Sequence, residues 1–591
     1  MRCVCPLGAL PKLAPKLPLV LICALYTAMA LATLKGLASA PSVADVSSWF
    51  AEHEAADHAS LLAQVSDGAA AKLYAALAPL VAAASASLAG QGEGENAGVG
   101  AAGKAPAQLP QGTCLAALRA VSALCLAYLD RGSSAEGGAA AGGGAAAGAR
   151  PKAPSAADRA VLSCLLALHA SLLALPRDGS REAAATLAAV QRACERAWAA
   201  SLPGAVAATP LLIMMLLSEL QDPAGATAAA LRRLYALRAA LAHIDLEAPD
   251  SAGMLELLLR GFVNPGVLRH DTGRKFLASV MALSDATALR AHGAMRSAFP
   301  LASPRWAEWY ADIYLRAWSA AHSAGGGAGE EEAPSASASA SASTPDAAAA
   351  AVTALTIETR CLQELLHRGL HAAAPAVFTS VRELTARLLA SKRTGRKDVG
   401  AMCARVYAPI LWRALEAPNT AVRRNAATLF RDAFPLTGAA ASGASSHAEQ
   451  VRRLLALAED ANPAIRELGT GFVAEALAKH WASFPALARV RLIERLALLA
   501  TDAAAPRVRC EAIRGLSLTL TIPPAHPVLL STGALAAAAV HVHDADARVR
   551  SAAAEVLGRV DVYKGSFPAG ALALLGDKGG GAAAGKACAG G

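Results

Sequence analysis

Aromatic and charged residues are both scarce in this chain of 591 residues. Phe, Trp and Tyr make up 4% of the sequence and Asp, Glu, Lys and Arg 17%, whereas apolar residues reach 54%. Much of the apolar fraction is alanine, the best helix former. No alternating run of β-branched residues is long enough to indicate a sheet. The composition therefore predicts an all-α protein.

The sequence also lacks a disulfide framework and a catalytic motif. Its eleven cysteines are odd in number and widely spaced, which favours a reducing compartment. Residues 98–105 and 580–587 resemble phosphate-binding loops, but each has alanine where the magnesium-binding hydroxyl is needed. His541, His543 and Asp544 resemble a metal cluster in sequence, but they lie at a predicted repeat turn, where Asp544 has a structural role, and no cysteine or further histidine lies nearby. We therefore expect no enzyme, no cofactor, no metal and no small-molecule substrate.

A short motif recurs four times in the C-terminal half. An acidic residue is followed by Val-Arg or Ile-Arg and then by a small residue. The arginines, 43, 43 and 41 residues apart, are Arg423, Arg466, Arg509 and Arg550. The acids are Glu416, Asp460, Asp502 and Asp544, and the small residues are Ala426, Gly469, Ala512 and Ala553. This period is typical of HEAT or armadillo repeats, so the sequence predicts an α-solenoid of such repeats.

The acid and arginine of the motif have a structural interpretation. In stacked helical hairpins, an acid in one turn can bond the arginine of an adjacent unit. We expect a ladder of such pairs to set the stacking, with a scaffold role for Asp460, Asp502, Asp544, Arg466, Arg509 and Arg550.

The first copy of the motif lies in a segment, 402–435, that predicts two helices joined by a turn at 416–420. The first helix is expected to bury Val406, Ile410, Leu411 and Trp412, and the second Val422, Ala426, Leu429 and Phe430. Asn419 and Thr420 are residue types that cap a helix N-terminus.

Low-complexity segments divide the chain, and they bury too little side chain to offset the entropy of ordering. We expect N-terminal helices at 43–89, a low-complexity linker at 90–113, and the N-terminal part of the solenoid at 114–324 with a disordered insert at 131–156. A disordered Ser/Ala/Gly linker at 325–349, the HEAT-repeat solenoid at 350–575 and a disordered tail at 576–591 complete the chain.

The first 42 residues form an apolar extension with several interpretations. Residues 17–34 are uncharged and lie at the lower limit of length for a membrane span. Residues 38–40, Ala-Ser-Ala, match a signal-peptidase site. A signal or anchor segment is one alternative, but the cysteine pattern favours an extension without a membrane function.

A basic turn stands out against a moderate net charge of +9. Residues 360–413 contain ten Lys or Arg and three acids. Four of the ten lie within six positions: Lys392, Arg393, Arg396 and Lys397. Such clusters attract phosphate backbones without reading sequence, so these four are candidate DNA-binding residues. A solvated surface loop is the alternative.

Several segments resemble the G-type HEAT subunit of condensin II, the second of the two condensin G subunits. The most specific is VYAPILWRALEAPNTAVRRNAATLFRDAFP at 406–435, and 231–279, 309–321 and 361–389 resemble the same family. With interruptions the similarity covers about residues 43–560. The N-terminal apolar segment and the low-complexity segments at 90–113, 131–156 and 325–349 depart from the family. The family also has further helical repeats at its C-terminal end.

The resemblance implies a non-enzymatic subunit that supports mitotic chromosome condensation in the nucleus. Its partners would be the kleisin subunit, a second HEAT subunit, two SMC ATPases and the DNA backbone, and ATP hydrolysis would belong to the SMC subunits. The basic turn falls where the family has a basic stretch, so the resemblance implies phosphate contacts by Lys392, Arg393, Arg396 and Lys397. Two alternatives remain: a HEAT scaffold for protein cargo that does not bind DNA, and a membrane-anchored helical protein.

Overall fold

The structure is a computed structural model in which most of the chain is described. The described residues are 65–92, 110–135, 154–176, 179–222, 226–298, 304–326, 345–393, 397–436, 447–563, 565 and 567. Helices occupy most of these residues, and no strand occurs among them. The predicted fold class, an all-α protein of stacked helical repeats, is confirmed. The chain divides into two compact units, residues 1–276 and 277–591.

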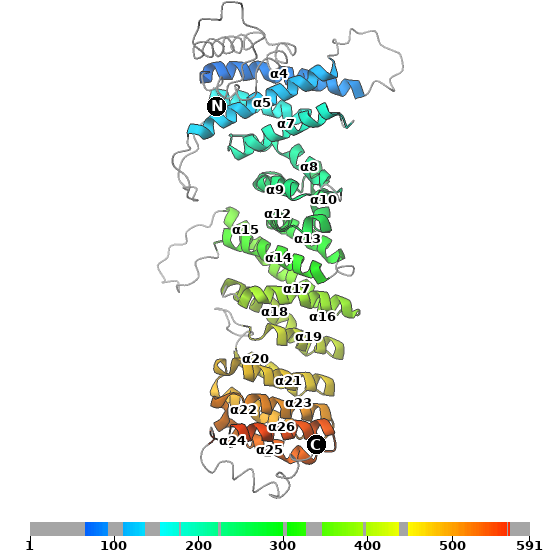
Figure 1. Ribbon diagram of the computed structural model, residues 1–591, viewed down its shortest axis with the longest axis vertical. Helices are drawn as coiled ribbons and strands as arrows, with labels where there is room; N and C mark the ends of the chain where they lie inside the picture. Colours follow the sequence, from blue (N-terminus) through cyan, green and yellow to red (C-terminus); the bar gives the residue numbers. More distant parts are fainter. Residues whose placement is uncertain are drawn as a thin grey trace, which may run out of the picture. The chain divides into compact units, whose positions relative to one another are not determined.

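The first unit consists of α-helices that pack on one another (Figure 1). Its helices are α4 (Asp67–Gly92), α5 (Gln111–Ala135), α6 (Ala156–Ser171), α7 (Arg181–Ala199), α8 (Pro210–Glu219), α9 (Ala228–Ala236), α10 (Ala252–Gly261), α11 (Pro265–Leu268) and the first part of α12 (Asp271–Met281). Ser155 begins α6 with a capping box, because its side chain accepts from Asp158 N while Asp158 accepts from Ser155 N.

Two apolar helices, α4 and α5, come first among the described residues of this unit. By length and composition, Asp67–Ala89 in α4 and Gln111–Asp130 in α5 could each cross a membrane, and the bent pair Pro523–Ser531 and Ala534–His543 passes the same test together. Buried Tyr74 of α4 donates a hydrogen bond to Leu124 O of α5 at 2.8 Å. The apolar residues 17–34 lie outside the described residues.

The second unit contains the predicted repeats. Its helices after α12 are α13 (Asp285–Ala298), α14 (Pro304–Ala324), α15 (Pro345–Thr356), α16 (Gln363–Leu370), α17 (Pro375–Arg393), α18 (Lys397–Leu415), α19 (Thr420–Ala433), α20 (His447–Ala458), α21 (Pro463–His480), α22 (Ala486–Leu499), α23 (Pro506–Thr519), α24 (His526–Ser531), α25 (Ala534–Ala539) and α26 (Ala547–Val562). A π-helical turn, Ile357–Leu362, joins α15 to α16.

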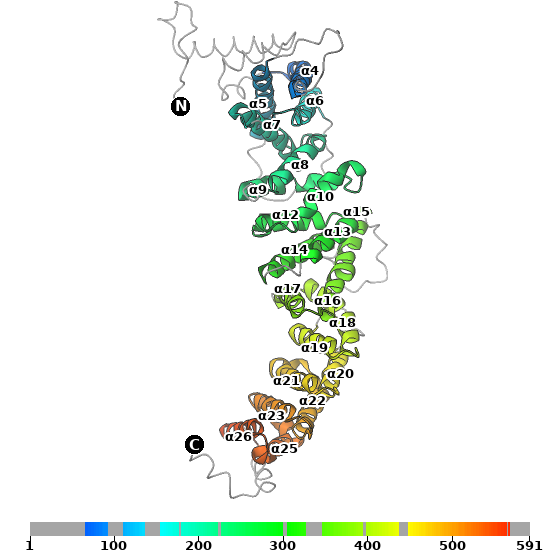
Figure 2. The ribbon, with the colours of Figure 1, turned by 90° about the vertical axis from the view of Figure 1, so that its right-hand side faces the viewer.

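The helices of the second unit form two layers (Figure 2). The layer of α19, α21, α23 and α26 lies on the inner side of its curve, and α18, α20, α22 and α25 lie on the outer side. Each inner helix packs against the next, as α21 does against α23 and α23 against α26. Burying one face of each helix against its neighbours is what makes such a stack continuous.

The segment 402–435 folds largely as its sequence predicts. Helix α18 buries Val406, Leu411 and Trp412, whereas Ile410 is half-buried. Helix α19 buries Val422, Ala426, Leu429 and Phe430. Asn419 caps α19 by accepting a hydrogen bond from Ala421 N at 2.8 Å.

The predicted ladder of ion pairs is present across the inner layer. Each arginine bonds an aspartate of the following unit: Arg423 with Asp460 at 2.8 Å, Arg466 with Asp502 at 3.1 Å, and Arg509 with Asp544 at 2.8 Å. In each pair both side chains are at most 16% exposed. The same arginines use Nη1 to bond carbonyl oxygens of their own turn, such as Ala417 O, Asp460 O and Asp502 O. Each arginine therefore ties its own turn to the next.

Glu416, the acid of the first motif copy, does not form a rung of this ladder. It pairs with Arg453 of α20, and its side chain is 65% exposed. The position 43 residues before Arg423 is Ser380, so no arginine precedes Glu416 in the register. The ladder therefore begins at the Arg423–Asp460 pair.

The small residue of the motif allows two helices to come into close contact. A Cβ atom placed on Gly469 of α21 would lie 2.7 Å from the backbone carbonyl of Leu457 in α20. The central parts of the predicted low-complexity segments, and the tail 576–591, lie outside the described residues.

Candidate nucleic-acid interface

The predicted basic turn lies where α17 gives way to α18. Lys392 and Arg393 are in the last turn of α17, and Lys397 is the first residue of α18. Arg396 lies outside the described residues. Two helix ends thus bring the backbone of three of the four predicted residues to one edge of the second unit.

Other basic residues of the region 360–413 are engaged within the fold. Arg405 bonds Glu358 at 2.7 Å, Arg382 bonds Asp432 at 2.5 Å, and Arg387 lies 3.4 Å from Glu308. The hydrogen bonds that Arg382 donates to the Asp432 carboxylate raise the pKa of Arg382 above its ordinary value. The excess of positive charge counted from the sequence is therefore partly balanced by acids from outside the region, and the basic turn carries its most concentrated part.

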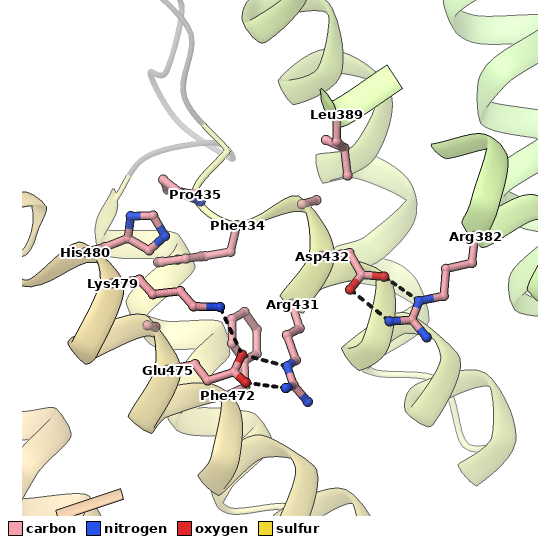
Figure 3. Close-up of a pocket in the computed structure, with 12 residues that line it drawn as sticks. Arg382, Leu389, Arg431, Asp432, Phe434, Pro435, Phe472, Glu475, Lys479 and His480 are labelled. Carbon is pink, nitrogen blue, oxygen red and sulfur yellow. Dashed lines mark hydrogen bonds and ion pairs between the residues drawn. The ribbon is translucent and has the colours of Figure 1, made fainter. Parts of the chain in front are cut away.

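A pocket of about 600 Å³ lies next to this turn, between α17, α19 and α21 (Figure 3). Arg382 and Leu389 of α17 line one side, one to three helical turns before the basic turn. The C-terminal ends of α19 and α21 supply the other sides, including Arg431, Lys479 and His480.

Ion pairs hold the charged groups around the pocket (Figure 3). Arg431 of α19 forms a bidentate pair with Glu475 of α21, and Arg382 of α17 binds both carboxylate oxygens of Asp432. Lys479 lies 4.0 Å from Glu475, and its side chain is 69% exposed. Because Lys479 is only loosely held, its ammonium group can turn to an anion at the pocket mouth.

The aromatic residues beside the pocket fix its shape. Phe434, which follows α19, packs edge-on against Phe472 with ring centroids 5.5 Å apart and stacks on Phe484 at 5.8 Å. His480 meets the same ring at 5.5 Å. The backbone of Leu436, two residues further on, is held on both its N–H and C=O by the buried Gln450 side chain at 2.9 Å.

Sequence reasoning missed the basic residues on α19 and α21. Arg431, Lys479 and His480 occupy the last turns of their helices, the position that Lys392 and Arg393 hold in α17. A cation there also stabilises the helix C-terminus through the helix dipole. Comparing the last turn of each inner helix in the sequence could have revealed this common edge.

A second pocket, of about 980 Å³, lies in the first unit between α7 and α9. Four arginines line it together with Trp198, and two of them are paired with acids, Arg233 with Glu195 and Arg196 with Asp130. The other two arginines are Arg192 and Arg232.

The structure shows what surrounds His541, Asp544 and the cysteines. Within the described ranges no group of three or more His, Cys, Asp or Glu could hold a metal ion. His541 lies 3.2 Å from Asp544, whose pKa is lowered to about 2, chiefly by the hydrogen bond from Arg509. The seven described cysteines are buried and form no disulfide with one another, and burial raises the pKa of Cys164, Cys194 and Cys361 to about 12.

The fold defines a class of protein, an α-helical repeat protein. The profile of a family described as "Condensin II non structural maintenance of chromosomes subunit" matches residues 260–334 and 344–438. The chain is 27% identical to Condensin-2 complex subunit G2 of Homo sapiens over 411 residues, 68% of this chain and 33% of the relative. It is 29% identical to the Danio rerio protein of the same name over 328 residues, 54% of this chain and 26% of the relative.

These matches confirm the resemblance to condensin II G-type subunits that the sequence indicated. The chain spans about a third of the length of the human relative. Among solved structures, a chain of the Pds5-Scc1 complex aligns at 12% identity and a TM-score of 0.35, covering 67% of this chain and 58% of that chain.

Proposed function

We propose that this protein is a non-enzymatic HEAT-repeat subunit of condensin II that supports mitotic chromosome condensation on nuclear chromatin. It would act as a scaffold, binding the kleisin subunit along the inner layer of its helices. The SMC ATPases and a second HEAT subunit would complete the complex and supply ATP hydrolysis. The matches to condensin II subunits across 68% of the chain are the main support for this proposal.

We further propose that the edge formed by the basic turn and the neighbouring pocket binds the DNA backbone. Lys392, Arg393, Arg396 and Lys397 would contact phosphates, and Lys479 lies exposed on the same edge. Point charges at helix ends bind phosphate without reading base edges, so the binding would depend strongly on salt and weakly on sequence. Because the acids at the pocket are held by Arg382 and Arg431, they would repel a phosphate less than free carboxylates do.

DNA binding by the full chain across a range of salt concentrations tests this assignment. Reversing the charge of all four predicted residues should weaken binding and flatten the slope of log K against log salt by up to about three to four units, because each phosphate contact contributes about 0.9. The control reverses four exposed arginines of the second unit away from this edge, Arg424, Arg491, Arg507 and Arg548, which should change the slope much less.

The control makes the outcomes distinct, since both variants lose the same net charge. If the slope is unchanged in the basic-turn variant, or falls equally in both variants, the turn does not bind DNA. If the unmodified chain fails to retain DNA at physiological salt while it binds protein partners, it is a scaffold for protein cargo.

A further inference from the structure

The pocket between α7 and α9 of the first unit is lined largely by apolar side chains. Its volume of about 980 Å³ lies at the upper end of the range in which proteins enclose drug-sized ligands, about 300–1,000 Å³. Trp198 of α7 lines it and donates a hydrogen bond from its indole nitrogen to Ala236 O of α9 at 3.2 Å. Buried or half-buried aliphatic residues of the lining are Leu126 of α5, Leu202, Ala205 and Val206 after α7, and Leu237 after α9. A ligand that fills this space must itself carry apolar groups.

Helical spacing also brings four arginines to this pocket. Arg192 and Arg196 are one turn apart on α7, and Arg232 and Arg233 are adjacent on α9. Arg196 and Arg233 pair with acids, and Glu195 is the only acid in the lining. Among the described residues no acid pairs with Arg192 or Arg232, and both side chains are exposed. The pocket therefore has two arginines whose positive charge no described acid balances.

An acidic peptide segment with apolar side chains fits these features better than a nucleic acid. A phosphate backbone binds rows of exposed cations and has no use for an aliphatic cavity. Proteins that hold single strands stack successive bases on several aromatic rings, whereas Trp198 is the only aromatic residue among those that line this pocket. Aliphatic side chains gain from burial in such a cavity, and carboxylates beside them can pair with unpaired guanidinium groups.

We propose that this pocket binds a segment of a partner protein in which one or two aliphatic side chains lie next to Asp or Glu residues. The aliphatic side chains occupy the cavity between α7 and α9, and the carboxylates pair with Arg192 and Arg232. The site lies in the first unit and shares no residue with the basic turn of the second. Its test is therefore independent of the DNA-binding assignment.

Fluorescence anisotropy of short fluorescein-labelled peptides with the full chain tests this assignment. The probes are a panel of peptides in which leucines are placed at every spacing among glutamates. Two matched panels replace leucine by serine or glutamate by lysine. We expect members of the first panel to bind, and members of the other two to bind about tenfold more weakly or worse, because each lacks one half of the complementary chemistry.

A matched pair of charge reversals locates the binding. Changing Arg192 and Arg232 together to glutamate should weaken it about tenfold or more, because attraction becomes repulsion. Changing Arg159 and Arg181 to glutamate alters the net charge equally at exposed positions of the same unit that do not line the pocket. This control should weaken binding by less than about twofold, because salt screens distant exposed charges.

A second pair of variants tests the cavity itself. Ala199 is an exposed residue of α7 that lines the pocket, so Ala199→Trp should fill part of the cavity and abolish peptide binding. Ala184→Trp makes the same change at an exposed position of α7 outside the pocket and should leave binding unchanged. Circular dichroism melting curves of all variants show whether each one is folded.

Four results would overturn the proposal. The first is that no peptide of the leucine–glutamate panel binds, and the second is that the serine panel binds equally well, so that only charge is recognised. The third is an equal loss of binding in a folded pocket variant and its matched control. The fourth is a DNA oligonucleotide that binds more tightly than any peptide and loses this binding when Arg192 and Arg232 are reversed, which would assign the pocket to nucleic acid.

Discussion

Replacing Arg509 with methionine removes one rung of the ladder while keeping most of the side-chain volume. The guanidinium binds both oxygens of Asp544, at 2.8 and 2.9 Å, and Asp502 O at 2.8 Å. The side chains of Arg509 and Asp544 are 12% and 7% exposed. The substitution therefore leaves a nearly buried carboxylate without its cation.

The expected cost of this change follows from the burial of the pair. Removing one partner of a buried ion pair costs about 3–5 kcal/mol. Asp544 keeps a hydrogen bond from Asp546 N at 2.8 Å and the contact with His541 at 3.2 Å, which places the cost near the lower end, about 3 kcal/mol. This corresponds to an increase of about a hundredfold in the opening of the contact between α23 and α26.

Native-state hydrogen exchange of α23 and α26 measures this opening, because units of a repeat array can open one at a time. The matched control is Arg514→Met on the same helix, where Arg514 is 55% exposed beside Glu511. An exposed pair is worth about 0–1 kcal/mol, so the control should change exchange by no more than about fivefold. If Arg509→Met has no larger effect than Arg514→Met, the ladder does not hold the units together.

Three further changes have defined outcomes. Gly469→Ala should lower the free energy of unfolding by about 1–3 kcal/mol, measured by denaturant titration, because the new Cβ would lie 2.7 Å from Leu457 backbone atoms; no change would disprove the close packing. His169 accepts from Leu211 N at 3.0 Å and burial lowers its pKa to about 4, so stability should be complete above about pH 6.5 and fall as the pH drops toward 4. His169→Gln should remove that part of the pH dependence, and an unchanged thermal melting profile from pH 7 to 4 would contradict this role. Asn419→Ala should cost about 1 kcal/mol by removing the cap of α19, measured by denaturant titration against Thr428→Ala, a half-buried residue of the same helix that does not cap it, as a control.

The repeat register could be predicted because it is a local pattern that recurs. Arg466, Arg509 and their aspartates appear at a fixed spacing, and one chemical argument applies to each copy. Glu416 shows the limit of the pattern. It could join the ladder only if an arginine lay one repeat period before Arg423 in the sequence, and Ser380 occupies that position, so Glu416 pairs with Arg453 instead.

The candidate interface could be predicted only in part. The basic turn is contiguous in sequence, so Lys392 and Arg393 were visible without a structure. Arg431 and Lys479 lie 38 and 86 residues beyond Arg393 and reach the same edge only because inner helices stack in parallel. The acids that hold Arg382 and Arg405 come from other helices, Asp432 from α19 and Glu358 from the π-helical turn, and no short-range spacing indicates such pairs.

Affinity purification of the tagged full chain, followed by mass spectrometry, tests the central claim most directly. The account predicts that the kleisin, the SMC ATPases and the second HEAT subunit of condensin II co-purify in comparable amounts, and that they still do so when the four residues of the basic turn are reversed in charge. Recovery of other cargo proteins without any of these subunits would contradict the assignment to condensin II.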